Sequence, residues 1–361
     1  MAAFKHELGP PAARRLADEL RRAWPEFPRG KFLAGIEAAL APLELTPRVA
    51  LLAERLAAAL PAEFDSAAEA LWRALDADSF RGWITLPCGA YVARHGIDQP
   101  HRALPLLAGL SPRFSSEGPL RPFIERHPAI TFDYLRRWAV DPDEHVRRLV
   151  SECTRPRLPW APLLRGFIAD PSPTLPLLDL LHDDPSLYVR RSVANHLNDI
   201  SKDHPDVALA CARRWIGSSE HAGWVVRHGL RTLVKRGDAT ALALLGADGR
   251  AEFRLLELAV ERGSIAIGDS AEFRFTLELL RGRDAEAVID YRVHYVGARG
   301  TKAPKVFKLT RRRIAPGQPL TLTRRHAFEH VSIRRIRPGR HTIDLQVNGR
   351  VLGAVSFDVV E

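Results

Sequence analysis

Cysteine is scarce in this chain of 361 residues, and its three cysteines, Cys88, Cys153 and Cys211, lie far apart. None of them belongs to a Cys-x-x-Cys pair. The sequence therefore does not support a disulfide framework or a cysteine-ligated zinc site, and we expect no metal and no cofactor. A sparse, odd set of cysteines is typical of a reducing compartment, so we expect a cytoplasmic protein.

Long apolar runs are also missing. No stretch approaches the roughly 20 apolar residues that cross a bilayer, and residues 1–7 lack the uninterrupted apolar segment of a signal peptide. The patterns G-x-S-x-G and H-E-x-x-H and the phosphate-binding loop do not occur either. These absences argue against membrane insertion, secretion and the hydrolases that carry those patterns.

Lysine is rare among the basic residues. It supplies only seven of 53, in a chain whose formal net charge is +10 and whose pI is about 10.0. Such a surplus favours an anionic partner, either nucleic acid or an acidic membrane face. A GC-rich genome and bidentate recognition of phosphate both explain the preference for arginine.

One ten-residue pattern occurs twice. The sequence Asp-Pro-x-x-x-Val-Arg-Arg-x-Val covers residues 141–150 and, 43 residues later, residues 184–193. This spacing fits two-helix repeats of the HEAT or armadillo kind, which stack into a curved surface. Each copy puts two arginines on the second helix of its unit, where they suit a polyanion. These arginines, with two that roughly continue the series, are Arg147, Arg148, Arg190, Arg191, Arg227 and Arg231.

Residues 11–245 show apolar residues at three- and four-residue spacing, which predicts helix after helix. Asp65-Ser66 and Asp133 are plausible helix starts. The predicted helices are 12–24, 32–40, 47–60, 66–75, 132–140, 143–153, 175–181, 186–198, 207–216 and 222–235.

The pattern changes near residue 250. Residues 273–279 and 343–347 alternate with period two, and Asn348-Gly349 joins the latter to residues 351–360 as a hairpin. About seven such strands predict an immunoglobulin-like β-sandwich without the usual disulfide. We therefore predict a mainly α protein, a HEAT-like α-solenoid at 1–250 followed by an all-β sandwich at 260–361.

The predicted β-sandwich is strongly basic. Between Arg299 and Arg340 there are thirteen Lys or Arg and one acidic residue, Glu329. A solubilising surface is one explanation, but a ratio this uneven favours contact with a polyanion. The arginines expected to make that contact are Arg311, Arg312, Arg313, Arg334 and Arg335.

Glu152 ends the first repeated helix, one turn after Arg148. A local ion pair, worth a few tenths of a kcal/mol, and a functional site explain this spacing equally well. The equivalent position in the second copy holds Asn195, and Asp199 follows one turn later. Polar residues thus occupy the same side of successive helices as the arginines.

The loop that follows Glu152 favours the functional site over a purely local ion pair. Residues 155–160 read Arg-Pro-Arg-Leu-Pro-Trp, which places Arg155, Arg157 and Trp160 in a rigid, proline-framed loop. An isolated tryptophan is more often a hydrophobic cover for the next helix. Beside carboxylates and arginines, Trp160 instead suits stacking on a sugar or a cationic base.

Three long motifs occur in a fixed order. They are Phe-Ser-Ser-Glu at 114–117 with Arg-Pro-Phe-Ile at 121–124, Ser-Glu at 151–152 with Arg-Pro-Arg-Leu-Pro-Trp at 155–160, and Leu-Asn-Asp-Ile-Ser-Lys-Asp-His-Pro at 197–205. In these motifs, over nearly its whole length, the chain resembles the AlkC branch of the AlkC/AlkD DNA alkylation-repair glycosylases. Some members of that branch carry a C-terminal immunoglobulin-like domain.

The resemblance implies a DNA-3-methyladenine glycosylase that acts on double-stranded DNA containing alkylated bases, and we expect it to be a monomer. It implies that Glu117, Glu152, Asp199 and Trp160 form the active site. It also implies HEAT-like repeats wrapped around DNA, and excision of cationic methylated bases, 3-methyladenine foremost and 3-methylcytosine as a further candidate, without base flipping. For Glu117 alone, a favourable interaction with the dipole at the start of a helix is an alternative interpretation.

The residue chemistry fits this expectation. An N3-methylated base is already cationic and leaves without a general acid, so the carboxylates need only stabilise positive charge on the sugar. One carboxylate can hold the attacking water. Arginines at the phosphates set position. The rival hypothesis is a non-catalytic HEAT-repeat scaffold that binds nucleic acid or an acidic protein, which explains the repeats and the charge but not the three motifs.

Overall fold

The computed structural model describes residues 4–247, 251–281, 284–297, 300–301, 303–331 and 334–361. Contacts within the chain define two compact units. The first comprises Met1–His204 and Trp215–Gly229, and the second comprises Pro205–Arg214 and Leu230–Glu361. Helices fill the first unit and the strands lie in the second, which confirms the predicted fold class. The first strand, Glu252–Val260, begins between the predicted domains 1–250 and 260–361 and ends at the first residue of the second.

The first unit consists of helices joined by short turns. Its α-helices are α1 (Pro10–Ala23), α2 (Arg29–Leu33), α3 (Ile36–Leu40), α4 (Leu45–Ala57), α5 (Phe64–Leu75), α6 (Thr85–His95), α7 (Pro100–Leu110), α8 (Glu117–Arg126), α9 (Pro128–Trp138), α10 (Glu144–Cys153), α11 (Arg165–Ala169), α12 (Leu175–Leu181), α13 (Leu187–Asp203) and α15 (Ala222–Gly229). Its 3-10 turns are η1 (Phe4–Leu8), η2 (Gly82–Ile84), η3 (Ser111–Arg113) and η4 (Ser172–Thr174). The remaining helices are α14 (Pro205–Trp215), α16 (Arg231–Arg236) and α17 (Ala239–Leu244).

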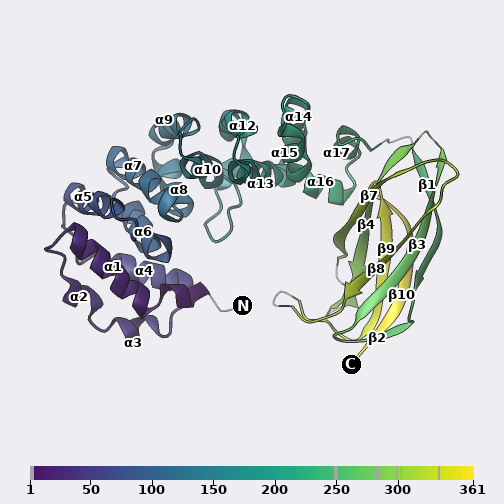
Figure 1. Cartoon of the computed structure of the whole chain (residues 1–361), viewed down its shortest axis with the longest axis horizontal. Coiled ribbons are helices and arrows are strands. Elements are labelled where there is room, and N and C mark those ends of the chain that lie inside the picture. Colours follow the sequence, from purple (N-terminus) through teal and green to yellow (C-terminus); the bar gives the residue numbers. More distant parts are fainter. Residues whose placement is uncertain (1–3, 248–250, 282–283, 298–299, 302, 332–333) are drawn as a thin grey trace. The chain divides into compact units, whose positions relative to one another are not determined.

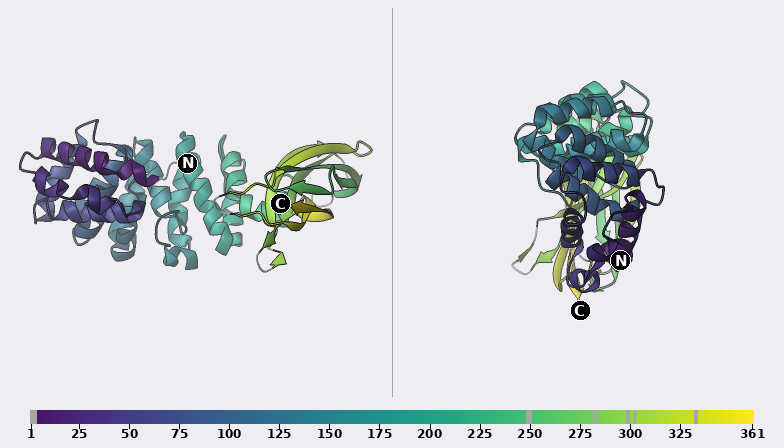
Figure 2. Two further views of the ribbon diagram at one scale, coloured as in Figure 1. Left: turned by 90° about the horizontal axis from the view of Figure 1, so that it is seen from below. Right: turned by 90° about the vertical axis from the view of Figure 1, so that its left-hand side faces the viewer.

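Two rows of helices form the first unit (Figure 1). Helices α7, α9 and α12 follow one another in one row, and α8, α10, α13 and α15 in the other. Within the second row α8 packs on α10, α10 on α13, and α13 on α15. Figure 2 shows from below that the helices succeed one another in sequence order. This is the stacked two-helix arrangement predicted from the 43-residue repeat.

The repeated pattern builds the turn that enters each second helix. Asp141 accepts a hydrogen bond from the Asp143 backbone N–H (2.8 Å), and Arg147 Nη1 donates to the carbonyls of Asp141 and Pro142 (2.8 and 2.9 Å). In the second copy Asp184, Ser186 and Arg190 repeat these interactions. Asp143 and Ser186 are also the N-caps of their helices, a position that favours Asp and Ser. The shared spacing of the two copies therefore follows from backbone capping.

Three details differ from the sequence prediction. The helix predicted at 32–40 breaks into α2 and α3 because Gly35 adopts the left-handed conformation (φ 65°). The helix predicted at 222–235 breaks at Leu230 into α15 and α16. Asp133 lies inside α9, which begins with Pro128 instead, so its prediction as a helix start was wrong.

The strands of the second unit form two main sheets and a short ribbon. The strands are β1 (Glu252–Val260), β2 (Ser264–Ala266), β3 (Ser270–Arg281), β4 (Ala285–His294), β5 (Val296–Gly297), β6 (Gly300–Thr301), β7 (Lys305–Ile314), β8 (Leu320–Ala327), β9 (Gly339–Val347) and β10 (Arg350–Val360). Their orders are β1-β3-β8, β2-β10-β9-β4-β7 and β5-β6. Strand β7 lies at the edge of the larger sheet and β8 at the edge of the smaller one.

The core of the sandwich comes from alternating apolar residues. Phe273, Phe275 and Leu277 of β3 are buried and share a hydrophobic cluster with Ile343 and Leu345 of β9. The predicted Asn-Gly hairpin between β9 and β10 is confirmed. Asn348 and Gly349 both have positive φ (47° and 78°), as a type I′ turn requires.

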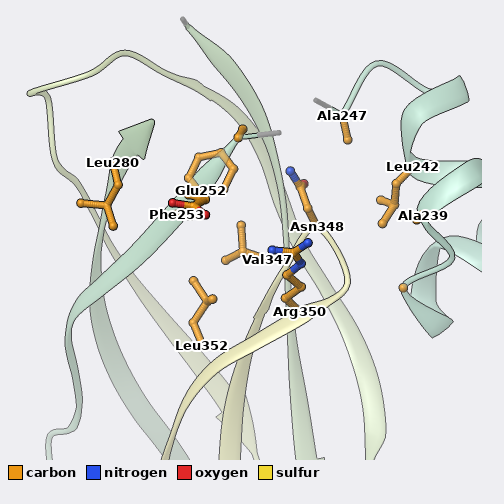
Figure 3. Close-up of a pocket in the computed structure, with 12 residues that line it drawn as sticks. Ala239, Leu242, Ala247, Glu252, Phe253, Leu280, Val347, Asn348, Arg350 and Leu352 are labelled. Atoms are coloured by element: carbon orange, nitrogen blue, oxygen red, sulfur yellow. The ribbon is translucent and has the colours of Figure 1, made fainter. Parts of the chain in front are cut away.

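The second unit also packs its last helices against the sandwich. The Gln346 amide donates to the carbonyl of Lys235 (3.3 Å), and the backbones of Gly237 and Gly349 approach so closely that a Cβ on Gly237 would lie 2.7 Å from the Gly349 carbonyl oxygen. A cavity of about 350 Å³ lies beside this contact, with Leu242 on the helical side and Val347 on the strand side (Figure 3). Helices α16 and α17 thus belong structurally with the sandwich.

Candidate active site

Three carboxylates converge from three successive helices of one row. Glu117 is the first residue of α8, Glu152 lies in the last turn of α10, and Asp199 lies in the second half of α13. Glu152 and Asp199 are only 6% and 2% exposed. Burial of a carboxylate is costly unless a cation and hydrogen bonds compensate it, so the partners of these groups define the site.

A continuous chain of ion pairs joins the three carboxylates. Arg148 Nη2 lies 3.3 Å from Glu117 Oε1 and 3.8 Å from Glu152 Oε1. Arg155 then links Glu152, through Nη1 at 2.6 Å from Oε1, to Asp199, through Nε at 2.9 Å from Oδ2. The local Arg148–Glu152 pair expected from the spacing is present, and it belongs to this larger chain of ion pairs.

Neutral groups and a lysine complete the set of partners. Ser192 Oγ donates to Glu152 Oε2 (2.5 Å), and Ser115 Oγ donates to Glu117 Oε2 (2.5 Å). Lys202 Nζ donates to Asp199 Oδ1 (2.8 Å). Each carboxylate is thus held by at least one cation and one further donor or cation, which fixes its orientation.

Arg148 and Arg155, the two arginines that link the carboxylates, stay charged. Burial alone would lower the pKa of Arg148, but the charges of Glu117 and Glu152 raise it above its ordinary value. Burial opposes the charge on Arg155 in the same way, and the charges of Glu152 and Asp199 again raise the pKa. The constellation is therefore a preorganised set of alternating charges.

A neutral histidine contacts the backbone of the helix that carries Glu152. His196 is completely buried, and its Nδ1 lies 3.0 Å from the carbonyl oxygen of Ser151. Burial lowers its pKa from 6.5 to about 3, so the imidazole is neutral at ordinary pH. It adds no positive charge that would compete for the carboxylates.

The loop that carries Trp160 is held by a buried arginine. Arg121 of α8 donates to the carbonyls of Cys153 and Arg155 (2.9 and 2.7 Å) and, through Nη2, to the carbonyl of Pro162 (2.7 Å). Trp160 itself has positive φ (64°), and its side chain is 81% exposed. The loop backbone is therefore fixed while the indole remains open to solvent.

The predicted DNA-binding arginines of the helical part fall into three groups. Arg148 and Arg155 lie in the ion-pair chain. Arg147 and Arg190 hold the turns of the repeated pattern, Arg147 also pairs with Asp184 of the next repeat (2.6 Å), and Arg157 pairs with Asp203 (2.9 Å). Arg191 and Arg227 are exposed, and Arg231 is half-buried.

The predicted arginines of the sandwich also differ from one another. Arg312 and Arg313 of β7 and Arg335 are exposed. Arg311 pairs with Glu286 (2.8 Å), and the Arg334 guanidinium lies 4.1 Å from the centre of the Tyr295 ring. The exposed members are those best placed to meet a polyanion.

Sequence reasoning missed several partners of the carboxylates. Ser192 occupies the position that the apolar Leu149 has in the first copy of the pattern. A polar residue at a helix position expected to be buried could have indicated a partner of a buried charge. Tyr188 was also missed; its ring lies 4.8 Å from the Arg148 guanidinium. Arg121 was visible only as part of a motif, because its role depends on carbonyls more than 30 residues away.

Comparison with known proteins places the chain in a family. YhaZ of Bacillus subtilis (strain 168), described as an uncharacterized protein, is 35% identical over 361 residues, which cover 99% of this chain and 100% of YhaZ. The chain belongs to the YhaZ family. Residues 254–361 also match the family model of the C-terminal Ig-like domain of YhaZ.

A solved structure extends this relationship. The alkylpurine DNA glycosylase AlkC of Pseudomonas fluorescens, bound to DNA containing an abasic-site analogue, matches with a TM-score of 0.94 at 35% identity. The match covers 99% of this chain and 100% of AlkC. The resemblance to the AlkC branch that the three motifs indicated is thereby confirmed.

Two kinds of feature are absent from the described residues. No helix among them combines the length and the apolar character that a membrane crossing needs. They also contain no group of three or more His, Cys, Asp and Glu side chains arranged to hold a metal ion.

Proposed function

We propose that this chain is a DNA glycosylase that releases cationic N-methylated bases, 3-methyladenine foremost, from double-stranded DNA. The observation that carries the proposal is the ion-pair chain from Glu117 through Glu152 to Asp199, in a chain that matches DNA-bound AlkC over its whole length. The reaction hydrolyses the N-glycosidic bond. Its products are the free neutral base and an abasic site.

The carboxylates stabilise the positive charge that develops on the deoxyribose. A base methylated at N3 carries a positive charge and leaves as a neutral molecule, so it needs no general acid. The electrons of the breaking bond go to the base, and the sugar becomes an oxocarbenium-like cation. Carboxylates fixed beforehand by Arg148 and Arg155 interact with that cation without reorganising, which is the condition for large electrostatic catalysis.

Trp160 and one carboxylate complete the reaction. An indole face against the charged sugar contributes a cation–π interaction of about 0.5–2 kcal/mol. A carboxylate oxygen holds the attacking water and takes its proton as the new C–O bond forms. In our proposal both groups act on the sugar, and the damaged base remains stacked in the duplex.

The exposed arginines hold the DNA backbone. Arg191 and Arg227 in the helical unit and Arg312, Arg313 and Arg335 in the sandwich would contact phosphates and so set position rather than sequence preference. We place this reaction in the bacterial cytoplasm, which suits three buried thiols, Cys88, Cys153 and Cys211, that form no disulfide with one another. We expect the protein to act as a monomer.

The test is incubation with duplex DNA that carries 3-methyladenine, followed by chromatographic analysis of released bases. We expect release of 3-methyladenine at the same rate with and without EDTA. Activity that EDTA abolishes and zinc restores would contradict the mechanism. Tight duplex binding with no release of any methylated base would instead favour the non-catalytic scaffold.

A further inference from the structure

Trp160 needs support that its own loop does not provide. Its backbone lies in the left-handed region (φ 64°), which residues other than glycine rarely adopt. Arg121 fixes the loop only through backbone carbonyls. The exposed indole is free to change rotamer unless another side chain contacts it. An unsupported indole would have to be ordered at each encounter with substrate, which weakens its contribution.

A row of aromatic rings provides that contact. The Phe4 ring meets the Trp160 indole edge to face, with ring centres 5.7 Å apart and planes at 62°. Phe4 also stacks on Trp83 (5.7 Å, 30°), and Trp83 packs on Phe114 (5.0 Å, 48°). These geometries are favourable for aromatic pairs. The row therefore runs from Trp160 through Phe4 of η1 and Trp83 to Phe114.

The turn that carries Phe4 is anchored. In η1 the side chain of Leu8 is fully buried, and Arg48 Nη1 donates to the carbonyl of Lys5 (2.8 Å), so the turn that carries Phe4 is held to α4. Phe114 lies three residues before Glu117 in the same segment. Phe4 and Phe114 nevertheless stay 50% and 38% exposed, which is unusual for rings whose only role is to fill a core.

We propose that Phe4 is a positioning residue for Trp160, and this rests on the proposed glycosylase function. Its ring holds the indole in one orientation before DNA arrives, and Trp83, itself packed on Phe114, holds Phe4. The segment around η1 is therefore part of the catalytic apparatus, although it lies more than 150 residues from Trp160 in sequence.

The first measurement separates positioning from binding. Single-turnover excision of 3-methyladenine with saturating enzyme is compared with the Kd for duplex containing an abasic-site analogue. We expect Phe4→Leu to slow excision about three- to tenfold, because an aromatic pair contributes about 0.5–1.5 kcal/mol. The Kd should stay unchanged, and Phe4→Tyr, which keeps the ring, should restore the rate. Failure of Phe4→Tyr to restore it would overturn the proposal.

A double-mutant cycle tests whether Phe4 acts through Trp160. In a Trp160→Ala background, Phe4→Leu should have no further effect on the excision rate, because the group that it positions is gone. Equal losses with and without Trp160 would overturn the proposal. Tyr134→Leu, which removes a ring packed on Trp138 in the same unit (5.3 Å), is the matched control and should leave the rate unchanged.

A measurement without DNA keeps the two proposals apart. Acrylamide quenching of Trp160, obtained as the difference between each protein and its Trp160→Phe counterpart, should increase in Phe4→Leu and not in Phe4→Tyr. Unchanged quenching would overturn the positioning role. Increased quenching in a protein that releases no base would support the contact and contradict only the glycosylase function.

Discussion

Glu152 shares partners with both of the other carboxylates. Arg148 connects it to Glu117 and Arg155 connects it to Asp199, while Ser192 satisfies its second oxygen. A buried carboxylate held this way is expensive to desolvate, and its full set of partners offsets that cost. Its negative charge remains available to a cation that forms nearby. Without the charge of Glu152, Arg148 still pairs with Glu117 and Arg155 with Asp199, so its loss should affect chemistry more than folding.

We predict that Glu152→Gln slows excision by about 100-fold or more, the typical effect of removing one preorganised electrostatic group. DNA affinity should stay the same or rise slightly, since a negative charge near phosphates is removed. Single-turnover excision and equilibrium binding to abasic duplex measure the two effects. Glu117→Gln and Asp199→Asn should behave alike, and Trp160→Ala should be milder.

The control for this substitution is Glu125→Gln, which removes an exposed carboxylate of α8. It should leave the excision rate and the melting temperature unchanged. A Glu152→Gln protein that melts early but keeps its specific activity would show that the Arg148–Glu152 pair only stabilises the fold.

His196 should make stability depend on pH. The unfolded imidazole takes up a proton near pH 6.5, whereas burial lowers the pKa of the folded one to about 3. The unfolded state therefore binds more protons between these values, and stability falls as the pH drops from about 6.5 toward 3, by at most about 1.4 kcal/mol per pH unit. In His196→Leu this contribution should disappear.

Urea unfolding at pH 7, 6, 5 and 4 measures the effect as the difference between the wild type and His196→Leu. His101→Leu, which removes an exposed imidazole of the same unit, is the control variant. Parallel curves for the wild type and His196→Leu would contradict the prediction.

At the scale of the element, the repeated pattern assigns different tasks to its two adjacent arginines. The first, Arg147, donates to the carbonyls of its own turn and pairs with the buried Asp184 of the next repeat. The second arginine of each copy, Arg148 or Arg191, points elsewhere: Arg148 enters the ion-pair chain and Arg191 is exposed. Adjacent positions on a helix face directions about 100° apart, so neighbouring arginines cannot share one task.

We predict opposite results for the two positions. Arg147→Ala should lower the free energy of unfolding by about 3 kcal/mol, because it leaves Asp184 buried without its guanidinium. Arg191→Ala should change stability by less than about 0.5 kcal/mol, as is usual for exposed residues. It should flatten the log–log salt dependence of DNA binding by about 0.9, the value for one phosphate neutralised by the protein.

Urea unfolding and binding titrations from 50 to 200 mM salt distinguish the two variants. A stable Arg147→Ala protein with a shallower salt slope would mean that the first arginine binds DNA after all. An unchanged slope in Arg191→Ala would remove Arg191 from the DNA surface.

At the scale of the whole molecule, the sandwich carries much of the basic surplus. Of its exposed arginines, Arg312 and Arg313 lie on the edge strand β7 and Arg335 lies between β8 and β9, and the self-repulsion of such a basic surface is offset when it binds a polyanion. Deletion of residues 260–361 would be a poor test of this role. It would remove the strands that contact the segment of α16 and α17, where Gly237 packs on Gly349 and the Lys235 carbonyl accepts a hydrogen bond from Gln346.

We predict instead that full-length Arg312→Ala/Arg313→Ala/Arg335→Ala keeps its melting temperature and binds DNA more weakly. Its salt slope should be shallower by up to about 0.9 for each phosphate that the variant no longer neutralises. The triple variant Arg254→Ala/Arg274→Ala/Arg281→Ala is the matched control, because it has the same net charge but removes arginines that already pair with glutamates of β1 and β3. Equal salt slopes in the two variants would mean that the basic residues of the sandwich contribute to solubility and not to DNA binding.

Local patterns in the sequence determined the classes of structure in this protein. The 43-residue repeat, the period-two segments and Asn348-Gly349 identified stacked helices and a sandwich with a tight hairpin, because periodicity and turn chemistry depend on residues close in sequence. The three motifs named Glu117, Glu152 and Asp199 as candidates. None of these patterns says which side chains meet across elements.

The tertiary structure alone decided how those candidates are partnered. Arg148 reaches Glu117 across 31 residues, and Arg155 reaches Asp199 across 44. The same applies to Phe4 and Trp160, whose rings join the first turn of the chain to the proposed site. Such pairings exist only after packing brings distant segments within a few ångströms, and burial then determines which charges must be paired. Sequence spacing fixes which helix face a residue occupies, and the stacking of helices fixes what that face meets.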